Sequence, residues 1–362
     1  YRKGMVSRMS KLPISVCIIA KNEEKYIEEC LRKVKPYGFE IVVADTGSTD
    51  ATKEIASRYA DKVVDFTWIN DFSAARNFCA QQASNNWILA LDCDEYVESI
   101  DIQILRVLLQ KKPKEVGVIR LKNIQLRDND QLGYSLDDLP RLYNRNYYHF
   151  EKPIHEQLVS IKNDSKRLDG FLMPMEVIHH GYAIKDDDMV KKQERNLEIL
   201  YDAVKEEPDN PYYYFQIGCS LQVLKKYDEA IEAYKKGLNL KPSTEIVYVV
   251  EMITSLASIY CDIGKKQEAL ALMEYYLKQC DKANFIFCYA NVLLENDQPI
   301  KAVMNYLKAT MMKDSNTLGE RLLTCYERVI AIYQKTGNED LAKPFEQKYL
   351  ECRAERERIV NK

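Results

Sequence analysis

The sequence of 362 residues predicts an α/β domain with a mostly parallel sheet, followed by an all-α domain. Two observations lead to this fold class. Over roughly the first 180 residues, short apolar runs alternate with amphipathic segments, an order typical of a parallel sheet with helices on both faces. Beyond residue 210, the pattern is helical throughout and repeats itself. We expect one domain over 1–184 and the other over 210–362, joined by a helix over 185–209.

The elements of the first domain are predicted from the periodicity of apolar residues. An unbroken apolar run indicates a strand that is buried on both faces, whereas apolar residues three and four apart indicate a helix. On this basis we expect strands over 14–20, 41–44, 62–66 and 87–92, separated by helices over 23–34, 50–59 and 72–83. The segment 121–140 has little regular pattern and predicts a loop that helps to build the ligand pocket.

The second domain begins with a charged amphipathic helix that ends near Pro208. The segment 211–242 then places aromatic, small and proline residues at nearly all signature positions of the tetratricopeptide repeat, which it resembles. The small residues Gly218 and Ala230 are expected to let paired helices pack closely. Weaker copies of the repeat align on later alanines, at Ala269, Ala302 and Ala342. The alternative is a plain helical bundle.

Composition argues against several classes of function. The chain is 46% hydrophobic and 30% charged, with a formal net charge of -3, so no overall field draws it toward nucleic acid or an anionic bilayer. We find no apolar run long enough for a membrane span and no secretory signal, and expect a cytoplasmic protein. The ten cysteines include no C-x-x-C pair, which predicts reduced thiols rather than disulfides or a zinc site. Cys93, between two acids, is the one we expect to be exposed.

Polar residues follow three of the predicted strands. Asn22 and Glu23 follow the first strand, Asp45 follows the second, and Asp92 and Asp94 end the fourth. Because ligands of parallel sheets bind at the carboxyl ends of the strands, these side chains should converge on one edge of the sheet.

The loop DTGSTD, residues 45–50, can be explained in two ways. As a structural element it is a turn, permitted by Gly47, that ends in a cap for the next helix. As a binding element it presents a carboxylate at the edge of the sheet. We expect both, with Asp50 as the cap and Asp45 facing a ligand.

The D-x-D sequence at residues 92–94 suits a hard divalent cation. Residues two apart at a strand end point the same way, so both carboxylates can face a metal ion that also binds diphosphate oxygens. The four histidines, which lie together in the same half of the chain, favour metal or proton chemistry there. They are His149, His155, His179 and His180.

Three motifs together resemble family 2 glycosyltransferases with the GT-A fold. In order, they are SVCIIAKNEEKYIEECL, IVVADTGSTDATKEIA and DFSAARNFCAQQASNNWILALDCDEY, and the resemblance covers roughly the first 180 residues. The later segments RLYNRN, KPIHEQL and VIHHGY, followed by the repeats, look like one subgroup of that family. It includes bacterial enzymes that glycosylate peptides, among them the S-glycosyltransferases of bacteriocin biosynthesis.

The resemblance implies a metal and diphosphate site. Asp92, Cys93 and Asp94 would form the D-x-D motif that binds Mn²⁺ or Mg²⁺ together with the diphosphate of a UDP-sugar. His179 would be a further metal ligand. The family more often has a single histidine at this position, so the alternative ligand is His180.

The resemblance also implies a nucleoside pocket. Asp45 would form a hydrogen bond with the uracil, and Asn22 and Glu23 would line the pocket. Arg76 would support the donor pocket or contact a phosphate, since its guanidinium group is a fixed fork of donors. Its alternative role is a structural ion pair with an aspartate.

Glu156 matches the position of the acidic catalytic base, and His155 is the rival base. We expect partial burial beside an apolar stretch to raise the pKa of Glu156 toward neutrality. The resulting hypothesis is an inverting, metal-dependent transferase that moves a sugar from a UDP-sugar to a Cys, Ser or Thr side chain of a peptide or protein held by the repeats. Its alternatives are a glycan or lipid-linked acceptor and a catalytically degenerate scaffold. No nucleic acid or membrane span is expected, and a homodimer is left open.

Overall fold

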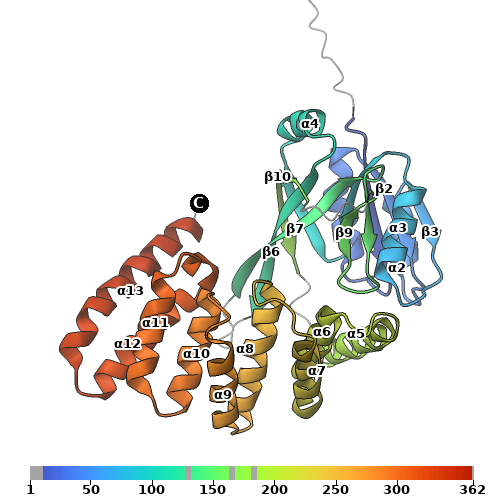
Figure 1. Cartoon of the computed structure of the whole chain (residues 1–362). Coiled ribbons are helices and arrows are strands. Elements are labelled where there is room, and N and C mark those ends of the chain that lie inside the picture. Colours follow the sequence, from blue (N-terminus) through green and yellow to red (C-terminus); the bar gives the residue numbers. More distant parts are fainter. Residues whose placement is uncertain (1–10, 127–131, 163–167, 181–185, 361–362) are drawn as a thin grey trace, which may run out of the picture. The chain divides into compact units, whose positions relative to one another are not determined.

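The computed structural model describes residues 11–126, 132–162, 168–180 and 186–360 (Figure 1). The chain divides after Met189 into two compact units. The first contains a sheet with helices, and the second consists of helices, which confirms the predicted fold class. The predicted boundary between the first domain and the joining helix, at residues 184 and 185, lies outside the described residues.

The first unit contains an eight-stranded sheet in the order β3-β2-β1-β4-β7-β6-β10-β5. The four strands β3, β2, β1 and β4 are parallel. Strand β7 runs antiparallel to both β4 and β6, and β10 is parallel to β6 but antiparallel to β5. The strands are β1 (Ile14–Ala20), β2 (Glu40–Asp45), β3 (Lys62–Asp65), β4 (Trp87–Leu91), β5 (Glu95–Ile100), β6 (Val116–Leu126), β7 (Leu132–Asn144) and β10 (Gly170–His179).

Between residues 11 and 180, the described part of this unit also contains four α-helices, one short 3-10 helix over Lys35–Tyr37 and a two-stranded hairpin. The helices are α1 (Ile27–Val34), α2 (Thr52–Tyr59), α3 (Phe72–Gln82) and α4 (Ile102–Lys111). The hairpin pairs β8 (Tyr148–Glu151) with β9 (Gln157–Ser160). The expectation of an irregular loop over 121–140 is wrong, because β6 and β7 pair along most of this segment.

The parallel strands are buried on both faces, as their unbroken apolar runs predicted. In β4, Leu89 belongs to one hydrophobic cluster, whereas Ile88 and Ala90 belong to another. Helix α1 contributes Leu31 to the first cluster, and α3 contributes Cys79 to the second. Since successive strand residues point to opposite faces, α1 and α3 cover opposite faces of the sheet.

The second unit is a series of antiparallel helix pairs that follows α5 (Asp186–Glu206). The pairs are α6 (Pro211–Val223) with α7 (Tyr227–Asn239), α8 (Val247–Asp262) with α9 (Lys266–Tyr276), α10 (Ala283–Glu295) with α11 (Pro299–Met311), and α12 (Arg321–Lys335) with α13 (Glu339–Val360). The four alanines on which the repeats were aligned each lie in the second helix of a pair and are at most 1% exposed: Ala230, Ala269, Ala302 and Ala342.

A close contact inside the first repeat explains its glycine. A Cβ atom at Gly218 would lie 2.2 Å from the ring of Tyr234, which is fully buried. We expect Gly218→Ala to lower the free energy of unfolding by about 2 kcal/mol. Overpacking costs ~3 kcal/mol at the upper end, and the better helix propensity of alanine offsets about 1 kcal/mol. Thermal unfolding of the full chain measures this.

Gly237 is the matched control for this substitution. A Cβ atom there would meet the flexible side chain of Met252, with the sulfur at 2.8 Å, so Gly237→Ala should cost less than Gly218→Ala. Equal unfolding temperatures for the two variants would contradict the packing explanation.

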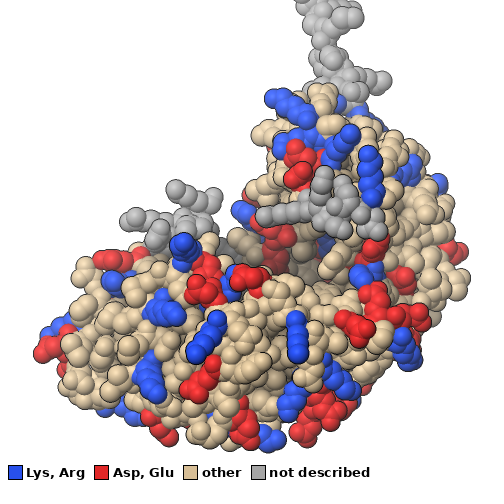
Figure 2. All heavy atoms as spheres, viewed as in Figure 1, with Lys and Arg blue, Asp and Glu red and all other residues tan. Residues whose placement is uncertain are grey.

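The surface carries charges of both signs. On the face shown in Figure 2, basic and acidic side chains are interspersed. Within the described residues, we find no helix with the length and hydropathy needed to cross a membrane. None of the ten cysteines, all of which lie in the described residues, forms a disulfide bond, as predicted. Cys93, however, is only 4% exposed, so the expectation that it is exposed is wrong.

Candidate active site

The loops that follow β1 and β2 are tied together by side chain to backbone hydrogen bonds. Asn22 has a left-handed backbone with φ of 57°, and its side-chain oxygen accepts a hydrogen bond from the Thr49 amide at 2.8 Å. The Asn22 amide donates in return to the Ser48 hydroxyl at 3.0 Å, and the Glu23 amide donates to the Thr52 hydroxyl at 2.7 Å. The structure therefore joins Asn22 and Glu23 to the 45–52 segment.

Asp45 ends β2 directly beside the end of β1. Its Oδ2 accepts hydrogen bonds from the amides of Gly47 at 3.2 Å and Ser48 at 3.1 Å. Its Oδ1 is buried and has no hydrogen-bond partner among the described residues. A buried carboxylate oxygen without a partner is costly, so this atom is a candidate acceptor for a ligand donor.

Asp50 was expected to be the cap of the next helix, but the N-cap position of α2 is Ala51, and Asp50 precedes it by one residue. Helix α2 begins at Thr52, and the Asp50 Oδ1 accepts a hydrogen bond from the Thr52 amide at 3.0 Å. The Asp50 Oδ2 accepts another from the Glu24 amide at 3.2 Å. Asp50 is thus committed to local structure, which leaves Asp45 as the ligand candidate of this loop.

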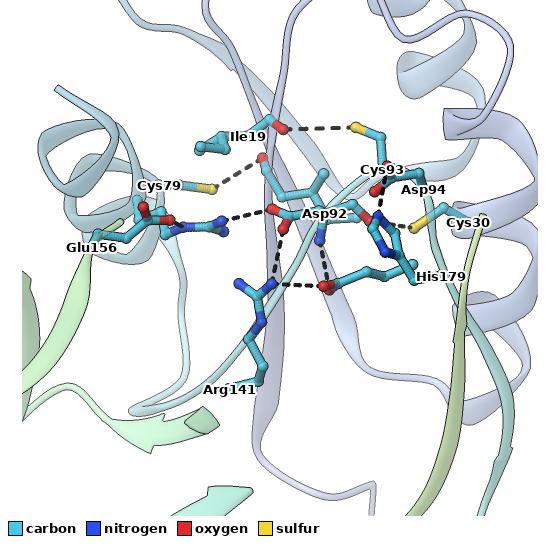
Figure 3. Close-up of polar contacts among 12 residues, drawn as sticks. Ile19, Cys30, Cys79, Asp92, Cys93, Asp94, Arg141, Glu156 and His179 are labelled. Atoms are coloured by element: carbon cyan, nitrogen blue, oxygen red, sulfur yellow. Dashed lines mark hydrogen bonds and ion pairs between the residues drawn. The ribbon is translucent and has the colours of Figure 1, made fainter. Parts of the chain in front are cut away.

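Asp92 lies between two arginines at the carboxyl end of β4 (Figure 3). Its Oδ1 is 2.6 Å from Arg76 Nη2, and its Oδ2 is 2.8 Å from Arg141 Nη2. Burial raises the pKa of Asp92, but the two guanidinium groups lower it more, and its net pKa lies well below the ordinary value. Asp92 is therefore ionised, and both of its oxygens have cationic partners.

Arg141 and Glu95 complete this cluster. Arg141 Nη2 also lies 2.6 Å from Glu95 Oε1, and Glu95 Oε2 accepts a hydrogen bond from the Asp92 amide at 3.0 Å. Glu95 is 2% exposed, and burial raises its pKa. Neither residue was among the predicted site residues, although Arg141 begins the RLYNRN segment. Arg141 comes close to Asp92 because strand β7 pairs with β4, and this pairing has no local signal in the sequence.

Arg76 joins Asp92 to Glu156. The Arg76 Nε forms an ion pair with Glu156, while its Nη2 binds Asp92. Burial raises the pKa of Glu156, but the positive charge of Arg76 outweighs it, so the net pKa is lowered. The expectation of a raised pKa is wrong, because it counted burial without the arginine. Arg76 thus forms the structural ion pair that was its alternative role.

The hairpin that carries Glu156 is fixed to α3 by Asn77. The Asn77 side chain donates to the Phe150 carbonyl at 2.8 Å and accepts from the Phe150 amide at 3.0 Å. Arg76, the preceding residue of α3, also lies over the Phe150 ring, with 5.6 Å to its centroid. His155 precedes Glu156, is exposed and has a left-handed backbone with φ of 51°.

His179, rather than His180, faces the second carboxylate of the D-x-D segment. The His179 Nε2 is 3.0 Å from Asp94 Oδ2. Burial lowers the pKa of His179, but Asp94 raises it more. The His180 ring instead contacts Tyr96, with 4.6 Å between centroids. His149 pairs with Glu151 at 3.1 Å, so the four histidines do not form one cluster.

Two side chains fit a divalent cation at this edge. The Asp94 carboxylate and the His179 imidazole are of the ligand types that bind Mn²⁺, and the two are already adjacent. Asp92 would have to release an arginine to join them. Among the described residues, no group of three or more His, Cys, Asp or Glu is arranged to hold a metal ion. The remaining ligands would have to come from substrate or water.

Cys93 does not present its thiol to this edge. The Cys93 sulfur is 3.7 Å from the Ile19 carbonyl oxygen, and the side chain is buried (Figure 3). Burial raises its pKa well above the ordinary value, so the thiol is neutral. Any ligand contact of Cys93 would involve its backbone.

Both units match known families. Residues 15–158 match the family model described as Glycosyl transferase family 2, and residues 211–244 match Tetratricopeptide repeat. The SPbeta prophage-derived glycosyltransferase SunS of Bacillus subtilis is 31% identical over 235 residues, which cover 64% of this chain and 54% of SunS. A TPR repeat-containing protein of Synechococcus elongatus is 29% identical over 252 residues, covering 67% of this chain and 60% of that protein.

A third relative has a more specific name. The lipopolysaccharide core biosynthesis glycosyltransferase LpsC of Rhizobium meliloti is 24% identical over 215 residues, covering 56% of this chain and 76% of LpsC. The chain spans about half the length of SunS. The mostly parallel sheet and the paired helices agree with these matches. The first unit has the GT-A fold and is similar to glycosyl transferase family 2 over residues 15–158, and the second is similar to the tetratricopeptide repeat over residues 211–244.

Proposed function

We propose that this protein is an inverting, metal-dependent glycosyltransferase of the cytoplasm that transfers a sugar from a UDP-sugar to a Cys, Ser or Thr side chain of a peptide or protein. The observation that carries the proposal is the set of polar groups at the carboxyl ends of β1, β2 and β4 in a glycosyl transferase family 2 domain. There, Asp45 has an oxygen without a partner in the described part of the chain, Asp94 adjoins His179, and Arg76 joins Asp92 to Glu156.

The donor would bind across the ends of β1, β2 and β4. The Oδ1 of Asp45 suits the N–H donor of a uracil, and Asn22 and Glu23 would line the same pocket from the tied loop. Cys93 would contribute only backbone. Arg76 has a buried Nη1 without a partner among the described residues, which supports a contact with the donor in addition to its ion pairs.

Asp94 and His179 would hold Mn²⁺ or Mg²⁺. Such a cation, when bound, neutralises negative charge that develops on a leaving diphosphate. Asp92, the other predicted ligand, would instead fix the position of Arg76 and Arg141 at the end of β4.

Glu156 would be the base. It is ionised, its Oε1 is held by Arg76, and inversion requires a base on the acceptor side opposite the leaving group. Its lowered pKa makes it a weak base for a hydroxyl group, whereas a thiol with an ordinary pKa of about 8.5 demands less of it. This favours a cysteine acceptor. His155 remains the rival base.

The repeats would hold the acceptor peptide. The first helices of successive repeats, α6 and α8, share an aromatic cluster in which Tyr212 lies 5.1 Å and Phe215 lies 5.7 Å from Tyr248, measured between ring centroids. Tyr212 and Tyr248 are partly exposed. Aromatic rings supply contact area at low entropic cost, which suits a surface that binds peptide.

We expect Tyr248→Ala to raise the KM for a peptide acceptor about tenfold, equivalent to ~1.4 kcal/mol, because an aromatic anchor would be lost. Release of UDP from the donor in the absence of acceptor should stay unchanged. Tyr275→Ala is the matched control, since Tyr275 lies on α9 and is 68% exposed. An unchanged acceptor KM in Tyr248→Ala would show that this aromatic cluster does not bind the acceptor. Its alternative role would then be a contact in a homodimer.

The direct test is incubation of the full chain with a panel of UDP-sugars and Mn²⁺. UDP release is measured together with the mass added to candidate peptides. The similarity to LpsC supports a second candidate, a glycan acceptor, so oligosaccharide acceptors belong in the same panel. Transfer to a glycan alone would favour that candidate. No release of UDP by the folded protein with any donor would favour a scaffold.

A further inference from the structure

Asn123 lies directly behind the imidazole of His179. Strand β6 carries Asn123 and pairs in parallel with β10, in a register that places Asn123 opposite His179. Asn123 is only 1% exposed. Its Oδ1 lies 2.8 Å from His179 Nδ1, on the side of the ring away from Asp94. A buried amide at this position needs a reason, since burying an amide is favourable only where it is hydrogen-bonded.

The carboxylate of Asp137 fixes the orientation of the Asn123 side-chain amide. The Asn123 Nδ2 donates to Asp137 Oδ2 at 2.7 Å, and an ionised carboxylate only accepts hydrogen bonds. The amide nitrogen must therefore face Asp137, and the amide oxygen must face His179. Since that oxygen can only accept, the His179 Nδ1 must carry a proton and donate it.

The proton on Nδ1 determines the state of the other ring nitrogen of His179, Nε2. With the proton fixed on Nδ1, a neutral imidazole has its lone pair on Nε2, which is the atom 3.0 Å from Asp94. This is the form of histidine that ligates a metal ion, and a partner on the far nitrogen holds the ring in the ligating orientation.

We propose that Asn123 is a positioning residue for His179, oriented by Asp137, and that the two together fix the tautomer that binds a divalent cation beside Asp94. The inference rests on the proposed metal site and names residues that the sequence motifs do not include. It concerns cation affinity, so it can be tested without any sugar donor.

The test measures binding of Mn²⁺ alone to the full-length protein, from the loss of the free-ion EPR signal at fixed pH. Asn123→Leu keeps similar volume and removes the acceptor, so Mn²⁺ affinity should fall about 10- to 100-fold, the usual effect of losing a partner behind a metal ligand. Asp138→Asn is the matched control. Asp138 is the next residue of β7, is exposed and pairs with Arg120, so its loss should leave Mn²⁺ affinity unchanged.

An exchanged pair separates positioning from packing. In the double variant Asn123→Asp with Asp137→Asn, a carboxylate accepts the Nδ1 proton and an amide donates to that carboxylate, so Mn²⁺ affinity should return to within a few-fold of wild type. The nitrogen-15 NMR shifts of the neutral His179 ring, recorded without a cation at alkaline pH, should show the Nδ1-protonated tautomer in the wild type and the exchanged pair. Asn123→Leu should lose this signature.

The outcomes are distinguishable from those for the proposed function. Wild-type Mn²⁺ affinity in Asn123→Leu, or failure of the exchanged pair to bind Mn²⁺ although its unfolding temperature is unchanged, would overturn the inference. Absence of Mn²⁺ binding by the wild type, with and without UDP, would overturn it as well, while sugar transfer could still occur. If the protein binds the cation normally but transfers no sugar, the role of Asn123 would be supported and the proposed function would be wrong.

Discussion

Asp94→Asn should lower kcat/KM with the UDP-sugar about a thousandfold. The substitution keeps the shape of the side chain and a hydrogen-bonding partner for His179, but it removes the carboxylate that pairs with that histidine. A bound cation supplies several kcal/mol of charge stabilisation, and ~4 kcal/mol corresponds to about a thousandfold in rate. The measurement is steady-state UDP release, with UDP affinity determined separately by calorimetry, which should also fall.

Two controls accompany Asp94→Asn. Excess EDTA should reproduce the loss in the wild type, and added Mn²⁺ should reverse it. Glu98→Gln removes an acidic side chain from β5 that pairs with Lys33 at 2.8 Å, outside the Asp92 to Glu95 cluster, and should leave activity nearly unchanged. Full wild-type activity in EDTA would remove the cation from the mechanism.

Glu156→Gln should lower kcat about a hundredfold or more with a Ser acceptor, within the usual range for removal of a general base. The Gln side-chain oxygen can still accept the hydrogen bond from Arg76 Nε, so the pocket should keep its geometry while the base is lost. With a Cys acceptor the loss should shrink as the pH rises toward 8.5, because the thiol then ionises without help. The measurement is the pH dependence of kcat for peptides that differ only at the acceptor residue.

His155→Ala decides between the two candidate bases. His155 is exposed, so its substitution should not disturb the fold, and we expect near-normal kcat. A harmless Glu156→Gln with every acceptor, together with an inactive but folded His155→Ala, would assign the base to His155.

Much of the architecture could be predicted from the sequence because it depends on local patterns. Unbroken apolar runs indicated the parallel strands β1, β2 and β4, and both faces of these strands are indeed packed. The small residues Gly218 and Ala230 indicated close helix pairs, and the buried contact with Tyr234 shows the reason. The positions of Asp45 and Asp94 at strand ends followed from chain order alone.

Only the tertiary structure decided what these groups contact and how they ionise. Arg141 reaches Asp92 from 49 residues along the chain, and Arg76 reaches Glu156 from 80 residues away, through strand and hairpin pairings with no local signal. Those contacts reverse the expected pKa shift of Glu156 and commit both oxygens of Asp92. The physical reason is that the pKa of a buried carboxylate depends on the sum of burial and nearby charges, and the charges come from distant segments. The sequence determined which polar groups reach the edge of the sheet, and the packing of β7, α3 and the β8–β9 hairpin determined their partners.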